Sequence, residues 1–169
     1  SVTSLKDHVF SKCTSLSQVT IVSPLTEIEE GMFEKCKELK CILYQETVTK
    51  IGDYCFSGCE SLEQMIIPDS INTIGKYAFS HCSSLEKIDF RSRLVLIDVY
   101  AFNECKKLIE IKLPIEITVI NQYVFNNCEA LKLIKIPDSV LYIKSNAFSN
   151  CKSLFDVHIP NSIVEIENN

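Results

Sequence analysis

The sequence is poor in features that mark several large classes of protein. It has four glycines among 169 residues and no glycine-rich loop of the kind that binds phosphate groups. Its longest apolar runs, such as Leu94–Ile97, have the length of a short strand. A membrane-spanning helix needs about 20 predominantly apolar residues. We therefore expect neither membrane insertion by this segment nor a nucleotide site built on a phosphate loop.

The sequence also lacks a block of charge of one sign. The formal net charge of −5 comes from 22 acidic and 17 basic residues that alternate along the chain. A protein that binds the nucleic-acid backbone needs a clustered basic face. The charge pattern therefore argues against nucleic acid as a partner.

What the sequence does have is a repeat of 23 residues without an insertion or deletion. Cysteine lies three residues after each phenylalanine, and leucine lies three residues after each cysteine. The three columns are Phe10, Phe33, Phe56, Phe79, Phe102, Phe125 and Phe148; Cys13, Cys36, Cys59, Cys82, Cys105, Cys128 and Cys151; and Leu16, Leu39, Leu62, Leu85, Leu108, Leu131 and Leu154. A unit this short cannot bury its own apolar face, so the units are expected to stack into a solenoid.

Each unit divides into three parts. Ser84–Phe90 alternates apolar and polar residues, which predicts a strand. Pro68–Ser70 is typical of a turn, because proline cannot continue the strand. Ile71–Cys82 is expected to return across the other side as a short extended piece and a tight helical turn.

The unit reads Leu-x-x-Ile-x-Leu, then Pro, then Ile-Gly-x-x-Ala-Phe-x-x-Cys, and it resembles the BspA-like class of leucine-rich repeats over all seven repeats. The resemblance implies a right-handed curved solenoid of about seven 23-residue repeats. A parallel β-sheet would line its concave face, with short strands and helical turns on the convex side. We expect residues 1–169 to form one such domain within a longer protein, with irregular turns at Ile21–Ile28 and Arg91–Ile97.

The cysteine column is best explained by packing. Equivalent atoms in stacked units lie about 4.8 Å apart and their side chains point the same way, which disfavours both disulfides and a tetrahedral zinc site. Packing is favoured over these two alternatives because free cysteine is a small and frequently buried residue. Outside the column, Cys55 is predicted to lie in the core and Cys41 to be exposed.

Two aromatic columns have structural interpretations. The phenylalanine column predicts a core spine rather than a platform for sugar or nucleic acid. Tyr54, Tyr77, Tyr100 and Tyr123 predict a stacked rim whose hydroxyls reach solvent.

No constellation of residues indicates catalysis, and no metal or cofactor is expected. His158 and Asp156 share a strand face, with Lys135 as the expected neighbour of His158, but no serine in these columns completes a triad. We therefore predict that the protein is not an enzyme.

The strand positions that point away from the core vary in chemistry from repeat to repeat. Solenoids usually bind partners on such a surface. The residues predicted to bind a partner run from an apolar pair to charges of alternating sign: Leu43, Ile66, Lys87, Asp89, Glu110, Lys112, Leu133, Lys135, Asp156 and His158.

We expect a non-enzymatic module that binds a protein through its concave face. The family resemblance implies adhesion, at a cell surface or after secretion, to a host or matrix protein. An intracellular scaffold or regulatory subunit is the alternative, because reduced cysteines suit the cytoplasm and none of the asparagines lies in a glycosylation sequon. A spacer between other domains and end-to-end self-association through uncapped ends remain open.

Overall fold

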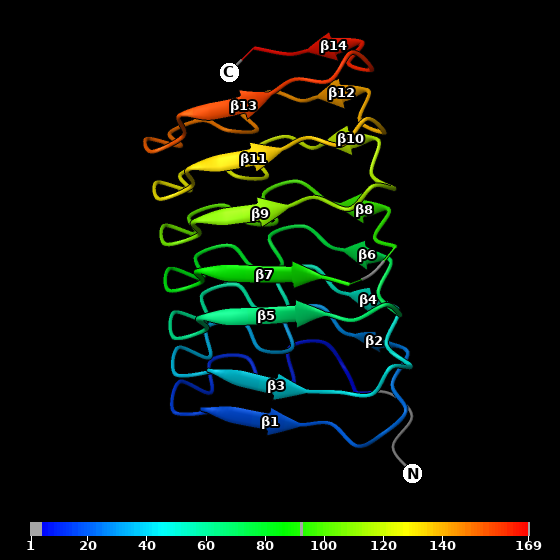
Figure 1. The fold of residues 1–169 in the computed structure, drawn as a ribbon. Coiled ribbons are helices and arrows are strands. Elements are labelled where there is room, and N and C mark those ends of the chain that lie inside the picture. Colours follow the sequence, from blue (N-terminus) through cyan, green and yellow to red (C-terminus); the bar gives the residue numbers. More distant parts are fainter. Residues whose placement is uncertain (1–4, 92, 169) are drawn as a thin grey trace.

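The computed structural model describes residues 5–91 and 93–168. Its strands form the two faces of a solenoid (Figure 1). The long-strand face contains β1 (Gln18–Thr20), β3 (Cys41–Leu43), β5 (Gln64–Ile67), β7 (Lys87–Phe90), β9 (Glu110–Lys112), β11 (Leu133–Lys135) and β13 (Asp156–His158). The short-strand face contains β2 (Glu27–Ile28), β4 (Lys50–Ile51), β6 (Thr73–Ile74), β8 (Leu96–Ile97), β10 (Val119–Ile120), β12 (Tyr142–Ile143) and β14 (Glu165–Ile166).

The strands pair in the register that the repeat predicts. All pairs are parallel and join residues 23 positions apart, as Gln18 and Cys41 do in β1–β3 and Leu133 and Asp156 do in β11–β13. The predicted leucine-rich repeat solenoid is therefore confirmed.

In the described part of the chain, strand pairing is interrupted once on each face. The long-strand face consists of the pair β1–β3 and a five-stranded sheet in the order β5-β7-β9-β11-β13. The short-strand face consists of β2-β4-β6-β8 and β10-β12-β14. The two interruptions, between β3 and β5 and between β8 and β10, lie in different parts of the stack (Figure 1).

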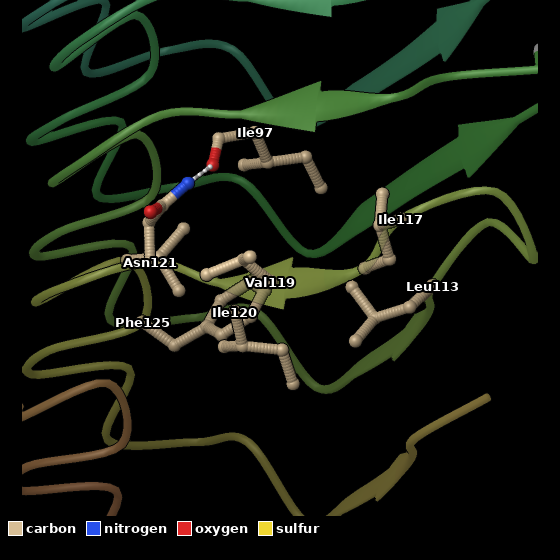
Figure 2. A pocket seen from close by; sticks show the side chains of 8 residues that line it. Ile97, Leu113, Ile117, Val119, Ile120, Asn121 and Phe125 are labelled. Atoms are coloured by element: carbon tan, nitrogen blue, oxygen red, sulfur yellow. Dashed lines mark hydrogen bonds between the residues drawn. The ribbon is translucent and has the colours of Figure 1, made fainter. Parts of the chain in front are cut away.

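A side chain bridges the break between β8 and β10. Figure 2 shows that Asn121 donates from Nδ2 to the carbonyl oxygen of Ile97 at 2.7 Å. In other repeats a backbone N–H makes the equivalent bond, as Gly75 does to Ile51 at 2.9 Å. The cavity beside Asn121 is otherwise lined by apolar side chains and measures about 10 Å³, so it has room for one water at most. This break therefore offers no ligand site.

The core is built on the phenylalanine column. Adjacent rings stack with centroids 5.2–5.7 Å apart from Phe10 to Phe148. The five inner rings are buried, whereas those of the first and last repeats are partly buried. Each fully buried ring contributes about 1.5–3 kcal/mol to stability. The predicted core spine is confirmed.

The prediction of a helical turn on the return side is wrong, since the described residues contain no helix. Each repeat has consecutive tight turns, such as the bonds from Ser57 N to Tyr54 O and from Cys59 N to Phe56 O. The residues two before and two after each phenylalanine adopt a left-handed conformation: His8, Lys12, Gly31, Lys35, Tyr54, Gly58, Tyr77, His81, Tyr100, Glu104, Tyr123, Asn127, Asn146 and Asn150.

Because left-handed residues alternate with residues of ordinary conformation in these turns, their backbone N–H groups point toward the next repeat. The N–H groups of Tyr54, Phe56 and Gly58 donate to the carbonyls of Lys76, Ala78 and Ser80 in the next repeat, each at 2.8 Å. A helix would instead use its N–H groups within its own turn. The left-handed residues therefore let the turns add a third hydrogen-bonded ladder to the two strand faces.

The last repeat exposes apolar side chains that are covered in earlier repeats. Val157 in β13 is exposed, whereas its equivalent Ile134 in β11 is buried. Ile159 is exposed in the same way, whereas its equivalent Ile136 is buried. Phe155 and Val164 are exposed at positions that are also exposed in earlier repeats. End-to-end association through such a surface stays a prediction.

We predict that Gly58→Ala lowers the free energy of unfolding by about 1–2 kcal/mol, because an L residue in the left-handed region pays this cost. The added Cβ would also lie 3.2 Å from Lys35 Cγ. Lys35→Ala is the matched control, since Lys35 already carries a Cβ in the same conformation. Urea denaturation of both variants measures the difference, and equal effects would contradict the assignment of the cost to the backbone.

Candidate partner-binding face

The long-strand face presents two columns of outward side chains. The second residue of each strand belongs to the inward column, as Ile111 does in β9 and Ile134 does in β11. The residues on either side point outward and meet their equivalents in the neighbouring strand. The outward columns therefore run along the stack in the predicted register.

The structure places all ten predicted partner-binding residues on this face. Asp89 is half-exposed, and the others are exposed: Leu43, Ile66, Lys87, Glu110, Lys112, Leu133, Lys135, Asp156 and His158. His158 pairs with Lys135 in the β11–β13 register, as predicted. Whether these residues bind a partner stays a prediction.

Charge is distributed unevenly along the face. Lys87 lies beside Glu110, so opposite charges are neighbours in the β7–β9 pair. Lys112 lies beside Lys135, with His158 next in the same column. Among the ion pairs of the described residues, none includes Lys112 or Lys135. This part of the face therefore carries positive charge with no acidic side chain bound to it.

An apolar patch lies at the break between β3 and β5. Leu43 and Ile66, one on each side of the break, are 58% and 51% exposed. Between the strands is a groove of about 400 Å³, also lined by Lys40, Cys41, Ile42, Tyr44, Glu46, Gln64, Met65 and Pro68. The groove combines apolar walls with two strand edges, which the sequence did not predict.

A second hollow of about 290 Å³ lies between the ends of β7 and β9, where Arg91, Arg93 and Lys112 face it together with Asp89 and Glu116. Arg91 Nε lies 3.5 Å from Asp89 Oδ2. Sequence reasoning missed the two arginines as surface residues of this face. The sequence feature that could have identified these arginines is that Arg91–Ile97 differs from the proline-containing turn of the other repeats.

Both hollows follow a strand whose turn has no proline at the usual position. Gln45 follows β3 and Arg91 follows β7, where Pro68 and Pro114 stand in the neighbouring repeats. The missing proline does not open the sheet by itself, because β1 is followed by Val22 and still pairs with β3 over three residues. The sequence therefore marks these turns as different without predicting the hollows.

The tyrosine column forms the predicted stacked rim. The rings of Tyr54, Tyr77, Tyr100 and Tyr123 stack with centroids 4.6–4.8 Å apart and parallel planes. They lie in the turns of the return side, away from the long-strand face. The rim thus stiffens the stack outside the candidate site.

The cysteine column is a packing element, as predicted, and each inner thiol also donates a hydrogen bond. Sγ of Cys59 lies 3.3 Å from the carbonyl oxygen of Phe33, and Cys82 repeats this contact with Phe56 at 3.2 Å. The nine cysteines are free thiols. Cys55 is buried and Cys41 is exposed, as predicted.

Burial makes the inner thiols of the column chemically inert. It raises the pKa of the Cys82, Cys105 and Cys128 thiols well above the ordinary value, since the thiolate would lose its hydration. In the less buried last repeat, burial raises the pKa of Cys151 to about 11. Thiolate chemistry at neutral pH is therefore disfavoured at these buried cysteines.

The described part of the chain contains no cluster of histidine, cysteine and carboxylate side chains that could hold a metal ion. Within the same residues, no helix has the length and apolarity needed to cross a membrane. His158 and Asp156 are both exposed on β13, and no described side chain forms a hydrogen bond with either of them.

Comparison with known proteins agrees with this architecture. The sequence profile of the BspA type leucine rich repeat region matches residues 1–108 and 49–169, with six copies of the profile. The profile thus counts one repeat fewer than the seven strands of the long-strand face. No curated protein matches the chain.

Solved leucine-rich repeat proteins of bacteria have similar structures. One from Bacteroides ovatus is 29% identical with a TM-score of 0.88, and the match covers 98% of this chain and 43% of that one. One from Eubacterium ventriosum is 27% identical with a TM-score of 0.73, covering 89% and 41%. One from T. pallidum is 27% identical with a TM-score of 0.65, covering 89% and 73%. The chain spans less than half the length of the first two.

We predict that two thiols react rapidly when the native protein is titrated with a thiol reagent at about pH 8. These are Cys13 and Cys41, the two exposed cysteines. The buried thiols should react at the rate at which the stack opens locally. Peptide mapping of the labelled protein assigns the sites. Rapid labelling of Cys82 or Cys105 would contradict a closed core.

Proposed function

Since the chain belongs to the BspA-type leucine-rich repeat family, we propose that it is a non-enzymatic module that binds a protein partner through the long-strand face. One observation carries this proposal: on a scaffold that keeps its register, this face exposes the large apolar side chains of Leu43 and Ile66 beside a groove. A contiguous exposed apolar patch is typical of an interaction site.

The distribution of charge supports a partner with two kinds of contact. Leu43 and Ile66 would contact an apolar segment. Lys112 and Lys135, which form no ion pair among the described residues, would contact acidic groups. In such an arrangement the apolar contacts provide affinity, and the charged side chains steer the partner toward the face. We propose adhesion at a cell surface as the setting, which is the role that the family resemblance implies.

A second candidate is an intracellular scaffold. The observation that favours it is the set of nine free thiols, which suits a reducing compartment. Surface labelling of intact cells followed by fractionation separates the two settings. Labelling at the surface supports adhesion, and recovery only in the cytosolic fraction supports the scaffold.

We predict that Leu43→Glu/Ile66→Glu and Lys112→Glu/Lys135→Glu each reduce capture of partner proteins by about tenfold or more, because hot-spot side chains contribute at least about 1–2 kcal/mol. Biotinylated protein would be incubated with cell extracts or intact cells, and captured proteins would be quantified by mass spectrometry. These variants should fold normally, because the four side chains are exposed.

Val95→Glu and Lys107→Glu are the matched controls, since both residues are exposed and lie outside the strands of this face. Their capture should equal that of the unmodified protein. Full retention of all partners by both double variants would remove the long-strand face as the binding surface.

A further inference from the structure

The break between β3 and β5 leaves two strand edges without a partner. β3 pairs with β1 over three residues, and β5 pairs with β7 over four. Within the described residues, no backbone hydrogen bond joins β3 to β5. Unpaired strand edges of this kind can pair with another extended chain.

The break is confined to the long-strand side. The same two repeats are joined on the opposite side by the β4–β6 pair and in the core by the Phe33–Phe56 stack at 5.6 Å. Ser61 N donates to Lys37 O at 2.9 Å just before the strands begin. The repeats are therefore firmly stacked, and the groove is a local opening of one sheet.

The floor and rim of the groove suit a strand. The inward side chains of Ile42 and Met65 are nearly buried at its floor, while Leu43 and Ile66 are exposed at its rim. An extended peptide alternates its side chains between two faces. One face of an added strand would thus pack on Ile42 and Met65, and the other would extend the rim.

Charge differs between the two ends of the groove, so it determines the direction in which a peptide with oppositely charged ends would bind. Lys40 lies immediately before β3, and Glu46 lies three residues after it; both line the groove. Among the described residues neither takes part in an ion pair. A strand parallel to β3 would match this arrangement if it were acidic at its amino end and basic at its carboxyl end.

We propose that the β3–β5 groove binds an extended segment of the partner protein as an added parallel strand. The segment has alternating apolar residues, an acidic residue at its amino end and a basic residue at its carboxyl end. This inference rests on the proposed function, because it assigns the kind of partner that the apolar part of the long-strand face binds. Backbone hydrogen bonds provide affinity, and the side chains provide direction.

A peptide with this chemistry is available from the chain itself. Residues 84–91, SLEKIDFR, contain β7, which pairs with β5 in the native sheet. In the register of the repeats its glutamate would lie beside Lys40, and its arginine would lie at the carboxyl end near Glu46. The acetylated and amidated peptide is the probe.

The readout is alkylation of Cys41, which is exposed and lines the groove. Cys13 is exposed outside the groove and serves as the internal control. We expect the peptide to slow alkylation of Cys41 at saturation by at least tenfold without changing the rate at Cys13. A peptide methylated on the backbone nitrogens of its isoleucine and aspartate should bind at least tenfold more weakly, because it cannot form the ladder.

A charge exchange tests the direction. The variant Lys40→Glu should bind the probe several-fold more weakly, and replacing the probe's glutamate with lysine should restore the affinity. Lys40 is exposed, so the substitution leaves the fold intact. Lys132→Glu, at the equivalent exposed position of a repeat outside the groove, is the matched control and should leave binding unchanged.

Three results would overturn the proposal: no selective protection of Cys41, equal binding of the methylated peptide, or protection of Cys41 that grows with protein concentration in the absence of peptide. The last result would assign the groove to a second copy of the chain. If the probe fails while Leu43→Glu/Ile66→Glu still abolishes partner capture, the strand proposal falls and the interaction module stands. If the probe binds as expected while both double variants retain all partners, the proposed function falls.

Discussion

The structure depends on one constraint: each repeat must meet the next in a register of 23 residues. Parallel strands, turn backbones, aromatic rings and thiols all follow it, as in the bond from Phe56 N to Ala78 O and the contact from Cys82 Sγ to Phe56 O. Since these contacts share one translation, an insertion of one residue would shift all of them together at that boundary. The absence of any insertion across seven repeats follows from this coupling.

The same constraint explains which parts of the fold could be predicted. Seven versions of one unit show which positions tolerate only apolar residues, so the phenylalanine spine, the buried thiols and the outward strand columns could all be predicted from the sequence. The placement of Cys41 on the surface and Cys55 in the core followed from their phase in the repeat alone. Phase in a solenoid determines burial because every inner unit has the same neighbours.

Two features could not be predicted, for different physical reasons. The left-handed turn residues mix glycine, asparagine and histidine, which favour that conformation, with lysine, tyrosine and glutamate, which rarely adopt it, so no single residue type marks these positions. Their strain is offset by backbone bonds to the next repeat, which exist only in the stack. The opening between β3 and β5 depends on how two neighbouring strands diverge. Gln45, in place of the usual proline, marks that turn without revealing the divergence.

A repeat protein can keep such an opening at modest cost. Stability in a solenoid is approximately a sum over neighbouring units, so losing a few strand bonds at one boundary removes only a few kcal/mol locally. At this boundary the β4–β6 pair and the Phe33–Phe56 stack still hold the two units together. The unpaired edges are thus held open by a rigid frame. When a partner strand binds to these edges, only the partner loses conformational entropy, because the two repeats are already ordered. Regular repeats provide the frame, and the β3–β5 boundary, where the described residues form no strand pair, provides backbone donors and acceptors for another strand.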